Sequence, residues 1–185
     1  MVSLALWAAG CGAAATPPAR VPIVDLLTEF PHAEARPAGS YRIALQQAAG
    51  ATRAAIVGPA PGRITWTLPV PRKAAFRTLV STTGLVRVRL GVSDLRTYEP
   101  HLERTIAAAD GWVQLDADLS EYAGVKFSLF YHPERFAWRI NVSIDALSGP
   151  ATIALAAPQL AAPERSGVEY ANRLAHAARP LRISR

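Results

Sequence analysis

Apolar residues occupy every second position from Phe136 to Ile144, and this alternation constrains the fold more than any other feature of the sequence. Polar side chains fill positions between them, as at Arg139, Asn141 and Ser143. Successive side chains of a β-strand point to opposite faces, so a period of two places the apolar set on one face. The segment therefore predicts a strand with one face turned inward.

Shorter stretches with the same alternation follow one another along the chain. The 15 prolines and 12 glycines are spread between them instead of forming one tract, which is typical of many short strands joined by turns. We expect strands near residues 41–45, 54–57, 63–70, 76–81, 86–92, 101–106, 113–118, 125–131, 136–145 and 152–157. The sequence thus predicts an all-β fold, an antiparallel β-sandwich spanning about residues 40–160.

Two short helical segments are expected outside the sandwich. Apolar residues near helical spacing between Val21 and Phe30, with Asp25 as a cap, predict a short helix or turn that covers one end of the sandwich. After Pro163 the apolar positions recur at intervals of three and four up to Pro180, which predicts an amphipathic helix followed by a basic end.

Cys11 is the only cysteine of the chain, so an internal disulfide and a cysteine-based zinc cluster are excluded. It follows an apolar run, and Ala8-Ala9-Gly10-Cys11 resembles a bacterial lipobox, in which the cysteine becomes the lipidated first residue. An apolar terminus with a free thiol is the alternative. The lipobox interpretation predicts a signal peptide at 1–11, a tether and covering segment at 12–39, the sandwich at 40–160, and a helix with a basic tail at 161–185. It also predicts export and a lipid anchor in the cell envelope.

The stretch from Asp110 to Tyr131 predicts two paired strands around a polar connection at 120–124. Trp112 and the runs DLS and YAG that follow it resemble a segment of jelly-roll β-sandwich modules of the galactose-binding-like and carbohydrate-binding type, which accompany secreted bacterial enzymes. The run APQL ending at Leu160 is similar as well. The resemblance covers mainly residues 63–160. It implies a jelly-roll sandwich that binds a glycan or braces a catalytic domain, often of the sulfatase type.

Recognisable catalytic machinery is absent from the sequence. It contains no G-x-S-x-G elbow, phosphate loop, dinucleotide fingerprint or sulfatase-type C-x-P-x-R motif, so we expect no enzyme activity and no cofactor. The 4 histidines have no metal-binding spacing. Asp110, Asp116 and Asp118 are carboxylates of the kind that holds calcium in related sandwiches. Because Asp116 and Asp118 lie two apart on one strand face without a third partner there, we expect a solvated face and no metal.

The net charge of +6 favours an anionic partner. Exposed strand positions at Arg87, Arg89, Arg104 and Arg139 would form a basic patch suited to phosphate or sulfate groups, although such arginines also keep an exposed sheet soluble. A nucleic-acid site needs exposed aromatic rings among its basic residues. Because the aromatics in phase with the apolar residues are expected in the core, we expect no nucleic-acid partner.

Aromatic residues outside the core could stack on the apolar face of a sugar ring. Trp66 and Trp138 are in phase with inward aliphatic residues, which favours a place in the core. Tyr98, in a predicted loop, and Trp112, at the entrance of a predicted strand, are freer to face a ligand. These two residues are the candidate ligand-binding side chains.

These observations lead to one functional hypothesis and one alternative. The hypothesis is a non-catalytic accessory or carbohydrate-binding-like lipoprotein of the bacterial cell envelope, whose partner is a glycan or another anionic envelope component. The alternative is the N-terminal bracing part of a secreted, sulfatase-like hydrolase whose catalytic domain is a separate partner or is absent from this chain. An in-frame or frameshifted sulfatase-like sequence downstream of Arg185 would favour the alternative.

Overall fold

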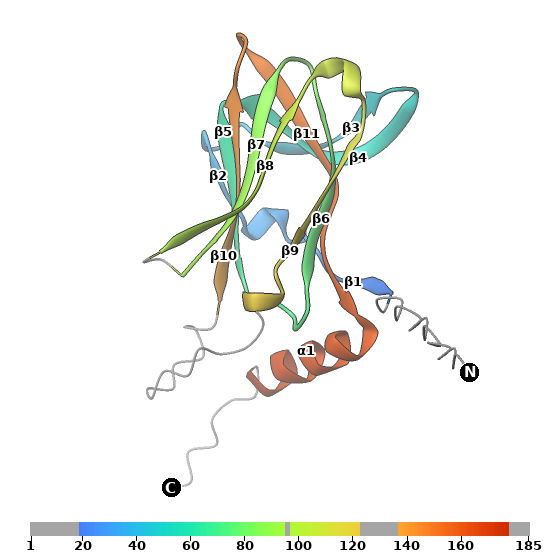
Figure 1. The fold of residues 1–185 in the computed structure, drawn as a ribbon, viewed down its shortest axis with the longest axis vertical. Coiled ribbons are helices and arrows are strands. Elements are labelled where there is room, and N and C mark those ends of the chain that lie inside the picture. The colour runs from blue at the N-terminus through green and yellow to red at the C-terminus, as the bar shows by residue number, and fades with distance from the viewer. Residues whose placement is uncertain (1–18, 95–96, 123–136, 178–185) are drawn as a thin grey trace, which may run out of the picture.

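The computed structural model describes residues 19–94, 97–122 and 137–177, and its strands form two antiparallel sheets (Figure 1). In sheet A the order is β3-β4-β11-β6-β9, and β1 also pairs with β11; in sheet B it is β2-β5-β10-β7-β8. The strands of sheet A are β1 (Arg20–Asp25), β3 (Arg42–Ala48), β4 (Ala51–Ala60), β6 (Ala75–Thr82), β9 (Val113–Asp118) and β11 (Ala151–Pro163). Those of sheet B are β2 (Glu34–Arg36), β5 (Gly62–Leu68), β7 (Val86–Ser93), β8 (Tyr98–Ile106) and β10 (Trp138–Ala146). The predicted all-β sandwich is confirmed.

The core lies between the two sheets and consists of the alternating apolar residues. Ile140 and Val142 of β10 are buried from sheet B, and Phe76 and Leu155 are buried from sheet A. Trp66 is 1% exposed, as expected of a core residue, and its indole N–H donates a hydrogen bond to the carbonyl of Leu26 at 3.1 Å. A buried indole needs such an acceptor, because an unpaired polar group in the core is costly.

The chain passes from sheet A to sheet B at Pro61, the one residue between β4 and β5. The sequence predicted strands over 54–57 and 63–70 with a connection of five residues between them, but β4 continues as a strand to Ala60. Glycine is required at Gly58 and Gly62, because a Cβ at either position would overlap the side chain of Tyr41. Tyr41 fills this space, donates a hydrogen bond to the carbonyl of Pro59 at 2.7 Å, and has its pKa raised to about 12 by burial.

The N-terminal segment corrects one prediction. A short helix or turn was expected over Val21–Phe30, but the first part of this segment forms β1, which pairs with the last part of β11. Asp25 does cap a turn, because its carboxylate accepts the backbone N–H of Leu27 at 2.9 Å, but the turn follows a strand. The free backbone edge of β11 outweighs local helical spacing here. Because β1 and β2 belong to the sheets, strands begin well before residue 40.

The C-terminal helix α1 (Glu164–Ala177) confirms the second helical prediction, but a different face packs against the sandwich. Gly167 contacts Ile23 of β1 so closely that a Cβ there would overlap the Ile23 side chain. The predicted apolar face is turned outward, with Val168 and Leu174 exposed. No helix within the described residues is long and apolar enough to cross a bilayer. Three short 3-10 turns complete the elements: η1 (Phe30–His32), η2 (Ala108–Asp110) and η3 (Ser120–Tyr122).

The predicted pair of strands around residue 120 is only partly within the described residues. Its first strand is β9, which pairs with β6. The second, predicted over Val125–Tyr131, lies outside the described residues. The alternation at the start of the sandwich gave the right strand, β3, but Ile43 and Leu45 are exposed at the edge of sheet A.

Candidate functional site

The outer face of sheet B carries a row of polar side chains across four neighbouring strands. Register places Arg36 of β2 opposite Arg63 of β5, Arg63 opposite Ser143 of β10, and Ser143 opposite Arg89 of β7. Arg139 and Arg87 lie on the same face, because each is an even number of residues from Ser143 or Arg89 along its own strand. We call this surface, defined by Arg36, Arg63, Arg87, Arg89 and Arg139, the arginine face.

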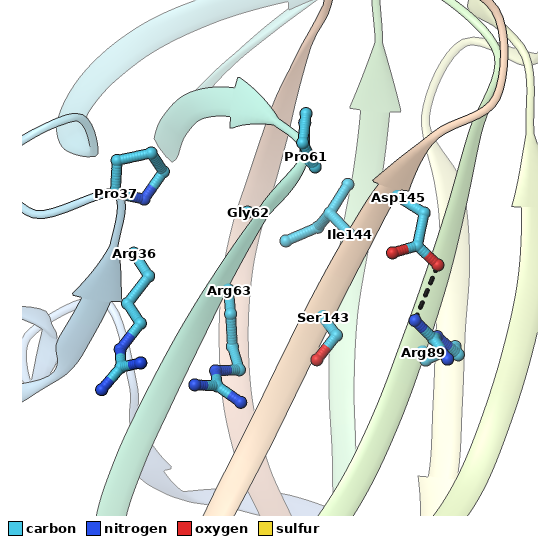
Figure 2. A pocket seen from close by; sticks show the side chains of 9 residues that line it. All are labelled: Arg36, Pro37, Pro61, Gly62, Arg63, Arg89, Ser143, Ile144 and Asp145. Carbon is cyan, nitrogen blue, oxygen red and sulfur yellow. Dashed lines mark hydrogen bonds and ion pairs between the residues drawn. The ribbon is translucent and has the colours of Figure 1, made fainter.

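Two adjoining hollows of about 370 and 300 Å³ lie on the arginine face and share Arg36 and Arg63 in their linings. The first also takes in Ser143 and the ion pair of Arg89 with Asp145 (Figure 2). The lining of the second, beyond the shared arginines, consists of Glu34, Ser93, Tyr98, Arg139 and Asn141. The hollows therefore present guanidinium, hydroxyl, amide and carboxylate groups together with one aromatic ring.

Three arginines of the face are paired with carboxylates. Arg89 lies 2.7 Å from Asp145, Arg139 lies 2.5 Å from Glu34, and Arg87 lies 3.4 Å from Glu103. In Arg89 and Arg139 the Nε atom is buried without a hydrogen-bond partner among the described residues, whereas in Arg87 the Nε atom is the one that lies 3.4 Å from Glu103, without forming a hydrogen bond. Each carboxylate thus engages only part of its guanidinium group, and the face keeps a surplus of donors.

Tyr98 lies at the start of β8, opposite Ser93 of β7, and its side chain is 48% exposed. Its ring covers Gly91, where a Cβ would overlap the Tyr98 phenol. The absence of a side chain at Gly91 lets the ring lie close against the sheet beside the second hollow. A half-exposed aromatic ring next to polar groups can stack on the apolar face of a sugar.

The structure does not bring the two sequence-predicted ligand residues together. Trp112 precedes β9 of sheet A and packs on the outer face of that sheet, whereas Tyr98 belongs to sheet B. The indole of Trp112 is half-buried, donates a hydrogen bond to the carbonyl of Ala51 at 3.0 Å, and has the guanidinium of Arg53 at 5.9 Å from its centroid. These contacts connect the β3–β4 hairpin to β9, and the indole N–H of Trp112 is already engaged in a hydrogen bond within the chain.

The surface around Trp112 is apolar. Ala55 and Val57 of β4 and Ala154 and Ala156 of β11 are buried on the outer side of sheet A, against Ala44, Leu79 and Trp112. We call this second cluster the alanine face.

Arg104, which the sequence placed in the basic patch with Arg87, Arg89 and Arg139, does not belong to the arginine face. It lies opposite the core residue Val88 and so projects from the other side of sheet B.

The predicted aspartates each have a partner in the chain. Asp116 pairs with Arg77 at 2.7 Å, and Asp110 accepts the backbone N–H of Ala107 at 2.8 Å. The Ser120 hydroxyl donates to Asp118 at 2.5 Å and lowers the pKa of that carboxyl, helped by the Ser120 backbone and by Arg20 at 3.3 Å, against the effect of desolvation. Within the part of the chain that the structure describes, no three such residues gather as a metal site.

Tyr122 forms a second polar cluster, which no sequence pattern predicted. Its hydroxyl donates to Glu99, and His101 Nε2 lies 2.5 Å from the same hydroxyl. Burial, and then Glu99, raise the pKa of Tyr122 well above its usual range. Tyr122 also packs edge to face against Trp138, with 4.9 Å between the ring centroids. The group is internally satisfied, which indicates a structural role at this end of the sandwich.

Arg36 and Arg63 contribute to the site although the predicted basic patch did not include them. Arg63 begins a predicted strand, and its phase with Thr65 and Thr67 is the signal that could have placed it on the outer face. Arg36 falls in a strand of three residues, too short to show an alternation. Cys11, the predicted lipidation site, lies outside the described residues.

Comparisons with known proteins give low similarities. No family model matches the sequence, and no curated protein matches it. Among solved structures, the chain is similar to TmCBM61 in complex with β-1,4-galactotriose, with 11% identity over 71% of this chain and 88% of that chain and a TM-score of 0.49. It is also similar to the CBM51-2 and INT domains of Clostridium perfringens ZmpB, with 14% identity over 69% of this chain and 29% of that chain and a TM-score of 0.47. A carbohydrate binding module of family 29 gives 18% identity over 66% and 77% of the two chains and a TM-score of 0.36.

Proposed function

We propose that this protein is a non-catalytic, glycan-binding module with a jelly-roll sandwich, and that the arginine face is its binding surface. The observation that carries the proposal is the half-exposed ring of Tyr98 beside a hollow lined by charged and amide side chains. Sugar rings offer one apolar face and a rim of hydroxyl groups, so they need an aromatic plane together with donors and acceptors. The second hollow supplies both.

The polar groups of this hollow are held in place by the sheet. Asn141 accepts the Thr65 hydroxyl at 2.9 Å and donates to the carbonyl of Arg139 at 3.0 Å, so its amide has a fixed orientation. Glu34 and Arg139 orient each other through their ion pair. Binding groups on strands, held by neighbours, lose little conformational entropy when a ligand arrives.

The test compares the two aromatic residues that the sequence singled out. Tyr98→Ala should weaken the binding of the best oligosaccharide from a glycan array about tenfold or more, because the stacking platform is removed. It should leave the free energy of unfolding nearly unchanged, since the ring is half exposed. Isothermal titration calorimetry and urea unfolding give the two quantities.

Trp112→Ala is the matched control, since it removes an aromatic ring from the opposite sheet. It should lower the free energy of unfolding by about 2 kcal/mol, because a half-buried ring and its hydrogen bond are lost. Affinity for the oligosaccharide should be unchanged. Unchanged affinity in Tyr98→Ala, or a loss confined to Trp112→Ala, would refute the proposal.

The proposal extends to location: the module is held at the cell envelope by a lipid on Cys11. The support is the run Ala8-Ala9-Gly10-Cys11, which is similar to a lipobox. Metabolic labelling of the expressed protein with a fatty-acid probe should give a labelled band that disappears in Cys11→Ala. A band that keeps its label in this variant would end the claim of an anchor at Cys11.

A further inference from the structure

Two arginines of the arginine face stand directly opposite each other without a carboxylate. Arg36 and Arg63 are paired across β2 and β5, and both are exposed. Neither has an ion pair or a side-chain hydrogen bond within the described residues, in contrast to Arg87, Arg89 and Arg139 of the same face. Like charges directly opposite on neighbouring strands destabilise a sheet, so an anion bound between the two guanidinium groups would relieve this repulsion.

The acidic residues of this face cannot supply that partner without breaking another pair. Glu34, next but one to Arg36 on β2, is engaged with Arg139 at 2.5 Å, and Asp145 is engaged with Arg89 at 2.7 Å. Figure 2 shows the Arg36 and Arg63 side chains extending in the same direction from neighbouring strands, with the Ser143 hydroxyl on the next strand. Two guanidinium groups and a hydroxyl therefore lie side by side on the same face of the sheet.

From this arrangement we propose that Arg36 and Arg63 bind a negatively charged group, a carboxylate or a sulfate ester, carried by a glycan. Guanidinium groups form paired, charge-assisted hydrogen bonds with such planar or multi-oxygen anions, and Ser143 can donate a further bond. Both arginines also line the hollow that contains Tyr98, so one oligosaccharide can stack on the ring and place its anionic group on the arginines. The inference rests on the proposed glycan-binding function and specifies an acidic glycan as its ligand.

The experiment uses matched pairs of oligosaccharides. An oligogalacturonide is compared with its methyl ester, and a heparin tetrasaccharide with its desulfated form, by calorimetry at fixed ionic strength. At least one acidic member should bind about tenfold tighter than its neutral counterpart, and which pair discriminates identifies the anion. Arg36→Gln and Arg63→Gln should each remove most of this preference, whereas Tyr98→Ala should weaken both members of the pair.

Arg104→Gln is the control, because it removes an equal charge from the other side of sheet B. If it reduces acidic binding as much as Arg63→Gln does, the effect is one of general charge and the inference is wrong. Equal binding of acidic and neutral sugars, unaffected by Arg36→Gln and Arg63→Gln, would also overturn the inference while leaving glycan binding intact.

Titration with inorganic sulfate separates the remaining outcomes. If sulfate shifts the NMR signals of Arg36 and Arg63 but no oligosaccharide binds, the anion site stands and the proposed glycan-binding function fails. Tighter binding of a single-stranded oligonucleotide than of any acidic sugar, lost in the same two variants, would overturn the choice of a glycan.

Discussion

The outer faces of the two sheets differ in what their alternate positions carry. On sheet A, alanine and valine residues of β4 and β11 are buried under Trp112, as at Ala154, which is 2% exposed. On sheet B, the equivalent positions carry arginines, three of them paired with acids, around two open hollows. The same period of two thus produces a second packed layer on one sheet and a polar, accessible surface on the other.

The outer faces of the two sheets therefore have different roles: one stabilises the fold, and the other is available for binding. Packing on the alanine face ties the β3–β4 hairpin to β9 through Trp112 and Ala51, which stabilises the fold. The arginine face contributes little packing of its own, so its residues are free to be selected for binding. Substitutions on the first face should change stability, and substitutions on the second should change affinity.

The largest effect is expected from a charge placed on the alanine face. Ala156→Asp would bury an unpaired carboxylate at a position that is 1% exposed, and should lower the free energy of unfolding by about 4 kcal/mol. Thr67→Asp, at an exposed position on the outer side of sheet B, should change it by less than about 0.5 kcal/mol. Urea unfolding of both variants measures the difference in their free energies of unfolding. If both variants lost the same free energy of unfolding, the two faces would not differ in packing as described.

A smaller effect, on affinity alone, is expected from Gly91→Ala. The added methyl group would push the Tyr98 ring off the sheet, because the two would overlap. Glycan affinity should fall several-fold, while stability changes by less than about 1 kcal/mol because the exposed ring can rotate away. Calorimetry on a double-mutant cycle checks the cause: in the Tyr98→Ala background the same substitution should have no effect on affinity. An equal loss in both backgrounds would show that Gly91 acts in another way.

The smallest effect concerns Asp118, at the outer edge of sheet A. Its pKa in the folded protein lies below that of the unfolded chain, so its contribution to stability is present above the unfolded pKa and is lost as the pH falls through the folded pKa. Asp118→Asn should therefore reduce the loss of stability that the protein suffers in acid, as followed by thermal unfolding over the acidic range. Its 65% exposure keeps the effect small. If thermal stability falls with pH equally in the wild-type protein and in Asp118→Asn, Asp118 does not contribute to the acid sensitivity of the fold.

Alternation in the sequence was sufficient to predict the strands with well-defined phase. β5, β7 and β10 occupy nearly the predicted residues, because each has one buried face in the core. β1 was missed because it depends on a partner edge in β11, more than a hundred residues away along the chain. Helix α1 likewise packs on the sandwich at Gly167, while Val168 and Leu174 of its predicted apolar face are exposed. In both segments tertiary contacts override the local periodicity of the sequence.

The candidate site was only partly predictable. The sequence indicated an arginine-bearing sheet face and an accessible Tyr98, and Arg87, Arg89 and Arg139 do share a face. It could not show that Arg36 joins them, because β2 has only 3 residues and its pairing with β5 is a tertiary contact. Nor could it separate Tyr98 from Trp112, since only the strand order assigns the two rings to different sheets.

The central claim is that ligand binds on the outer face of sheet B, and NMR mapping tests it most directly. Isotope-labelled protein is titrated with the best-binding array glycan. The account predicts shifts centred on the amides of Arg63, Gly91 and Tyr98, with the Trp112 indole and Ala156 amide unchanged. Shifts centred on Trp112 and the alanine face, or none in sheet B, would contradict it.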